Sequence, residues 1–71
     1  MKSFYHFVLT YRGANNEFGY FAEEVFEDSM FPRTSTSFSE LSEYIEMQAS
    51  TYMTTAVFDE LWDVYTTKYS L

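Results

Sequence analysis

Apolar residues recur at helical spacing in four stretches of the chain, and short segments rich in Gly, Asn, Pro, Ser and Thr separate these stretches. None of the four sustains the strict alternation of apolar and polar residues that is typical of a half-buried strand. The pattern predicts helices at approximately 3–12, 16–29, 37–49 and 54–69, within a single domain spanning 1–71. We therefore expect an all-α protein, folded as a compact four-helix bundle.

Residues at the predicted helix ends support the first two boundaries. Ser3 is a suitable N-cap for the first helix, and Gly13 accepts the left-handed conformation that often ends a helix. Asn15 or Asn16 can cap the second helix, which must end before Pro32. Because apolar residues surround most of the first helix, we expect it to lie at the centre and to touch the other three.

The third and fourth helices have equally clear patterns. Ser37-Phe38-Ser39-Glu40 is a capping box, in which Ser37 and Glu40 each satisfy a free amide of the first helical turn. One side of the fourth helix is apolar, which predicts that Phe58 and Trp62 belong to the core. In the second helix, one side is acidic and is expected to face water: Glu23, Glu24, Glu27 and Asp28.

Several motifs follow one another in a distinctive order: Ser3-Phe4-Tyr5, Tyr11-Arg12, Phe31-Pro32-Arg33-Thr34-Ser35, Tyr44-Ile45-Glu46 and Phe58-Asp59-Glu60-Leu61-Trp62-Asp63 with Tyr65. In order and spacing the chain resembles the YozE family of short bacterial proteins, from Met1 to the last helix. The resemblance implies a four-helix bundle similar to sterile alpha motif domains. "SAM-like" denotes that fold and not the methyl-donor cofactor. The resemblance implies no established function.

Composition sets the scale of the core. A chain of 71 residues can build one hydrophobic core, and the absence of cysteine leaves packing as the source of stability. Eight Phe, seven Tyr and one Trp supply the large side chains for that core. The apolar run near the start, Phe4 to Leu9, is too short for a membrane span or a signal-peptide core. We expect a soluble cytoplasmic protein that does not enter a membrane.

The residue types needed for catalysis or cofactor binding are scarce. There is no cysteine, and no serine lies in a nucleophile-elbow pattern beside which His6 could act as a base. With only Gly13 and Gly19, no phosphate-binding glycine loop can be written. Glu23 and Glu27 lie one turn apart, but no histidine completes a bundle metal site. We expect no enzyme activity, no cofactor and no metal, and we expect His6 to be a surface residue.

A protein-interaction module is therefore the favoured function, although the sequence does not determine the role or name the partner. Val57 and Val64 lie on the side of the fourth helix away from Trp62, and we take them as candidate partner contacts. Three methionines, Met30, Met47 and Met53, are expected to fill the core, with an adaptable partner surface as the alternative.

The first alternative function is association with nucleic acid, and a stand-alone structural domain with a transient partner is a third possibility. Lys2, Arg12 and Arg33 lie at predicted helix ends or in a loop and could form a small basic patch. The net charge of −7 opposes this function, because nucleic-acid binders normally carry a clustered excess of cations.

Overall fold

The computed structural model describes residues 2–69, which form four helices and no strand. The helices are α1 (Phe4–Leu9), α2 (Glu17–Glu27), α3 (Phe38–Gln48) and α4 (Thr55–Tyr69). The predicted all-α fold is confirmed. The largest difference from the predicted ends is in α1, which stops at Leu9 because residues 10–13 form turns. Met1, Ser70 and Leu71, which the predicted domain range included, lie outside the described residues.

Three predicted N-caps are present. The side-chain oxygens of Ser3, Asn16 and Ser37 accept hydrogen bonds from backbone amides three residues further on, at 3.3, 3.0 and 3.3 Å. Each bond satisfies one of the amides that a helix leaves free in its first turn. Gly13 has a φ of 90° and takes the chain out of the turns that follow α1.

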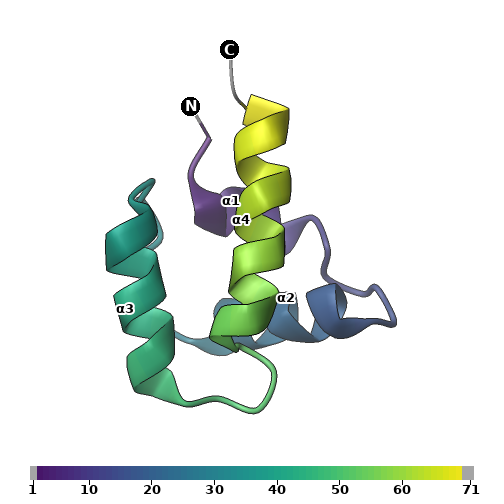
Figure 1. The fold of residues 1–71 in the computed structure, drawn as a ribbon. Coiled ribbons are helices and arrows are strands. Elements are labelled where there is room, and N and C mark those ends of the chain that lie inside the picture. Colours follow the sequence, from purple (N-terminus) through teal and green to yellow (C-terminus); the bar gives the residue numbers. More distant parts are fainter. Residues whose placement is uncertain (1, 70–71) are drawn as a thin grey trace.

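Helix α4 is the central element, since it packs against each of the other three helices. Figure 1 shows α3 standing beside α4, and α2 running nearly crosswise to them. The expectation that the first helix would touch all the others was wrong, because α1 packs only against α2 and α4. The reason is length: α1 has 6 residues and α4 has 15. Within residues 2–69, no helix is both long enough and apolar enough to cross a membrane.

The core is built around the ring of Phe4. This fully buried side chain lies with its ring centroid 5.2–6.4 Å from five other aromatic rings: Phe7, Phe21, Phe58, Trp62 and Tyr65. Phe58 is fully buried as predicted, whereas Trp62 is only partly buried and packs at the edge of the core between Phe4 and Phe38. The hydroxyl of buried Tyr65 donates a hydrogen bond to the carbonyl oxygen of Lys2 and so ties the start of the chain to α4.

Gly19 lies where α2 meets the segment that precedes it. A Cβ atom at this position would be 1.9 Å from the carbonyl oxygen of Ala14. The position of a Cβ atom is fixed by the backbone of its own residue, and the Ala14 oxygen is itself a backbone atom. No side-chain rotation can therefore relieve the contact. The absence of a side chain at Gly19 therefore fixes how closely the connection after α1 can pass α2.

We predict that Gly19→Ala destabilises the protein by about 3 kcal/mol or more, because the added methyl group must push two backbone segments apart. Helix propensity alone predicts the opposite sign, a gain of about 0.5–1 kcal/mol. Urea unfolding measures the difference. Gly13→Ala is the matched comparison, because a Cβ there meets nothing within 4 Å and only the positive φ is unfavourable. A Gly19→Ala variant at least as stable as the parent would contradict the packing described here.

Ala49, which ends α3, has a left-handed backbone with φ 50° and ψ 40°. Because a Cβ atom disfavours this conformation, Ala49→Gly should stabilise the protein by about 0.5–1 kcal/mol. Ala56→Gly, in the first turn of α4, should have the opposite effect and cost about 0.5–1 kcal/mol. Thermal unfolding of the two variants checks the prediction, which fails if both shift the midpoint in the same direction.

Candidate interaction surface

The two valines predicted as partner contacts differ in exposure. Val64 is 38% exposed, whereas Val57 is only 8% exposed and belongs to the core cluster. The expectation that Val57 faces solvent was wrong. Val57 lies one helical turn before the fully buried Leu61. Because α4 packs against three helices, more than one side of α4 is buried, and Val57 lies on a buried side. Val64 is left as a single exposed apolar residue on this helix side.

The three predicted basic-patch residues have separate surroundings. The Nε atom of Arg12 lies 3.2 Å from a carboxylate oxygen of Glu23, and its guanidinium lies 3.5 Å from the ring centroid of Phe26. Arg33 lies over the ring of Tyr5 at 5.4 Å. Lys2 is exposed. The contacts found among residues 2–69 link none of the three to another. The charge of Arg12 is therefore compensated by the carboxylate of Glu23.

The side chains considered for chemistry are also placed. His6 is exposed as expected, and its Nδ1 atom lies 2.7 Å from the hydroxyl of Ser3. Glu23, which was considered as half of a cation site with Glu27, is instead the partner of Arg12. Within the described chain, no group of three or more His, Asp or Glu side chains is arranged to hold a metal ion.

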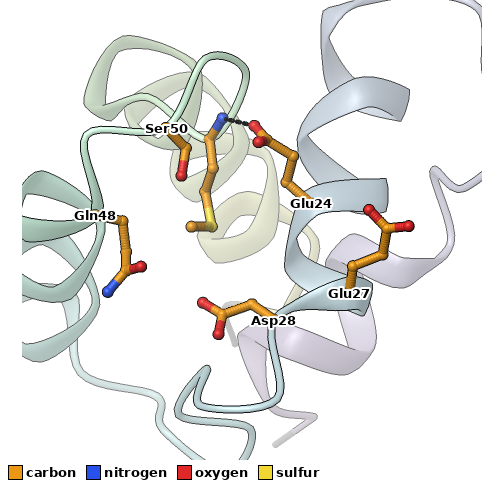
Figure 2. A pocket seen from close by; sticks show the side chains of 6 residues that line it. Glu24, Glu27, Asp28, Gln48 and Ser50 are labelled. Atoms are coloured by element: carbon orange, nitrogen blue, oxygen red, sulfur yellow. Dashed lines mark hydrogen bonds between the residues drawn. The ribbon is translucent and has the colours of Figure 1, made fainter.

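A hollow of about 210 Å³ lies between α2 and the segment that joins α3 to α4. We call it the acidic hollow, and its lining consists of Glu24, Glu27, Asp28, Gln48, Ser50 and Met53. Figure 2 shows Glu24 and Asp28 pointing from α2 toward this segment, while Glu27 is turned to the side. Met53 is 2% exposed and forms an apolar floor. The hollow therefore has the apolar side chain of Met53 at its bottom and carboxylates around its sides.

Glu24 holds the segment after α3 in place. One of its carboxylate oxygens, Oε2, accepts hydrogen bonds from the backbone amides of Tyr52 and Met53, each at 2.6 Å. These are charge-assisted bonds, which are stronger than bonds between neutral groups. The expectation that the acidic side of the second helix simply faces water was therefore wrong for Glu24, which is partly buried.

Asp28 makes a second link, from the end of α2 to α3. Its Oδ1 atom accepts a hydrogen bond from the amide of Met30 at 3.0 Å, and its Oδ2 atom accepts one from the hydroxyl of Tyr44. Burial of the Tyr44 hydroxyl, together with the hydrogen bond to Asp28 and the charge of Asp28, raises the pKa of Tyr44 to about 12. Tyr44 is therefore a neutral donor at physiological pH.

A second hollow has a volume of about 350 Å³, and the Tyr44–Asp28 hydrogen bond joins one of its lining residues to one of the first hollow. We call it the α3 hollow, and it is lined by Glu40, Glu43, Tyr44 and Met47. The two hollows together are lined by five of the 11 acidic residues and by none of the four basic ones. Their electrostatic field favours a cation.

Exposed apolar side chains lie at the two ends of this acidic region. At one end the rings of Tyr20 and Tyr52 pack together with their centroids 5.1 Å apart, and they are 41% and 51% exposed. At the other end lie Met30, whose amide donates to Asp28, and Met47, which lines the α3 hollow, and each is 78% exposed. We define the interaction surface as the two hollows with these four side chains.

The sequence analysis identified the acidic side of the second helix and gave a partner surface as the alternative role of the methionines, but it did not bring these residues together. The prediction that three methionines fill the core is correct for Met53 and wrong for Met30 and Met47. A usable signal was present at Met47, because both of its neighbours in the sequence, Glu46 and Gln48, are polar. The tyrosine pair had no such signal, because Tyr20 and Tyr52 come from distant parts of the chain.

Comparison with known proteins identifies relatives along nearly the whole chain. The family model described as "YozE SAM-like fold" matches residues 3–67. The UPF0346 protein YozE of Bacillus subtilis is 46% identical over 67 residues, which cover 92% of this chain and 90% of that protein. The UPF0346 protein SERP0997 of Staphylococcus epidermidis is 47% identical over 64 residues, covering 90% and 86%. The UPF0346 protein RBAM_019500 of Bacillus velezensis is 43% identical over 70 residues, covering 96% and 95%. The names of these relatives state no activity, substrate or partner. No solved structure gave a significant match.

The raised pKa of Tyr44 predicts how stability depends on alkaline pH. Between the ordinary pKa of 10 and the folded value of about 12, the unfolded chain releases the Tyr44 proton while the folded chain keeps it. The stabilisation is complete below pH 10 and is lost as the pH rises through about 12. Tyr44→Phe should therefore make the free energy of unfolding fall less steeply in this range. Urea titrations at several pH values measure the slope, with exposed Tyr52→Phe as the control; equal slopes for the parent and Tyr44→Phe would contradict the prediction.

Proposed function

We propose that this chain, which belongs to the YozE SAM-like family, acts as a small non-enzymatic protein-interaction module. The observation that carries the proposal is the interaction surface, in which two 78% exposed methionines and an exposed tyrosine pair flank a lining of five carboxylates. Exposed apolar groups bordered by polar ones are typical of protein-binding sites. Methionine in particular suits such a site, because its flexible side chain adapts to a partner.

Charge supports a protein partner over nucleic acid. The acidic lining repels phosphate groups, and Arg12, one of the three candidate basic residues, already pairs with Glu23. Arg33 lies over Tyr5 and Lys2 is at the start of the chain, so the described contacts do not unite them into one binding site. A nucleic-acid binder gains most of its affinity from clustered cations, which favours the protein-interaction role here.

Two further parts of the proposal rest on residue types. The non-enzymatic role is supported by the position of His6, the one histidine, which contacts Ser3 away from both hollows. A cytoplasmic location is supported by the cysteine-free sequence, which suits a reducing compartment. The proposed module therefore works by contact alone, on a partner inside the cell.

Site-specific photo-crosslinking in cells tests the role of this surface. A photoreactive amino acid placed at Met47 should yield discrete adducts with another protein, because this side chain is 78% exposed beside the α3 hollow. The same amino acid at Val64, an exposed apolar residue of α4, should yield few adducts. Adducts that form equally at both positions, or that nuclease removes, would contradict the proposal. Adducts from Val64 alone would return the partner contact to α4.

A further inference from the structure

We infer that the occupant of the interaction surface is a basic amphipathic segment of a partner protein, with apolar residues on either side of a central Arg or Lys. The inference rests on the proposed function and specifies the chemistry of the partner. Three features carry it: the sign of the charge in the hollows, the position of the apolar ends, and the shape of the acidic hollow between them.

The sign of the charge decides the class of partner. Five carboxylates line the two hollows, and none of the four basic residues of the chain does. A second copy of the chain would bring another such surface and a further net charge of −7, so like charges would oppose self-association through this face. A cationic partner gains attraction at the same contacts.

The distance between the two apolar ends of the interaction surface sets the spacing of apolar residues in a ligand. Tyr20 lies in α2, and Asp28, eight residues further on, caps the C-terminus of this helix, about 12 Å away along the helix axis. Tyr52 packs on Tyr20 at the first end, and Met30 donates its amide to Asp28 at the second. A helical ligand lying along this line matches the spacing when it carries apolar residues at positions i and i+8. Position i+4 then falls over the acidic hollow, on the same side of the ligand helix.

The acidic hollow is suited to a long cationic side chain. Its volume of about 210 Å³ corresponds to roughly seven waters at liquid density. Met53, a buried residue of the lining, offers an apolar surface to the aliphatic stem of Arg or Lys, while the charged head reaches the carboxylates. Glu27 lies at the rim, with its exposed side chain turned to the side. Among residues 2–69 no hydrogen bond or ion pair holds its carboxylate, so the side chain is free to rotate toward a bound cation. Glu24 and Asp28 already accept backbone and tyrosine donors, so they add charge without needing to move.

A synthetic helical peptide with leucine at i and i+8 and arginine at i+4 is the probe. Titration into the labelled protein should shift the amide resonances of Tyr52 and Met53, because both amides donate to Glu24, whose carboxylate faces the hollow. Resonances of Glu60 and Asp63, on the exposed side of α4, should stay in place. A control peptide of the same composition carries the arginine at i+6, on the opposite side of its helix, and should bind about tenfold more weakly.

A charge exchange makes the test specific. Glu27→Lys should weaken binding of the arginine peptide about tenfold, and a peptide with glutamate at i+4 should recover most of that loss. Glu60→Lys is the matched control, since it makes the same charge change on α4 and should have little effect. Met47→Ser should weaken both peptides, because it removes an apolar contact.

Each failure points to a different error. Equal binding of the two arginine positions, or no recovery by the glutamate peptide, would overturn the inferred partner chemistry. Absence of peptide binding while Met47 still crosslinks to a cellular protein would also overturn it, and the interaction role would stand. If Met47 gives no crosslinks in cells, the proposed function fails whatever the peptides do.

Discussion

Burial of the aromatic face of α1 is the constraint on which the rest of the structure depends. A helix of six residues has almost no stability alone, because nucleation costs more than so few hydrogen bonds return. It forms because Phe4, Phe7 and Val8 are buried against α2 and α4, and the Phe4 ring contacts rings from both helices. The Tyr65–Lys2 hydrogen bond then anchors its entry. A short element thus unites helices that are far apart in the sequence.

This arrangement leaves one side of α2 for a different task. On its apolar side, Phe21 and Val25 are fully buried. Its acidic side supplies Glu24 and Asp28, which bind the segment after α3 and the side chain of Tyr44. Carboxylates that stabilise the fold also give the interaction surface its charge. Because these two carboxylates are fixed by hydrogen bonds, the negative field of the acidic hollow is already in place before a partner arrives.

The sequence was informative where the physics is local. Helical spacing predicted the four helices, and Ser3, Asn16 and Ser37 act as caps because a cap needs only a residue three positions away. It was uninformative where distant segments meet. Glu24 bonds to amides 28 and 29 residues further on, and no local pattern marks such a pair. For the same reason periodicity placed Val57 on a side of its helix but could not show that neighbouring helices cover that side.

The same distinction explains why the candidate surface differs from the predicted one. Arg12 looked available in the sequence, but folding places it on the ring of Phe26 and beside Glu23, where its charge is compensated. Met30 and Met47 looked like core residues, but the core was filled by aromatic side chains that interlock around Phe4. Because aromatic side chains fill the core, Met30 and Met47 lie on the surface. Their exposed apolar area lowers the solubility of the protein unless a partner covers it. The surrounding carboxylates offset that cost by keeping the protein hydrated, and they carry the charge on which the inferred cationic partner depends.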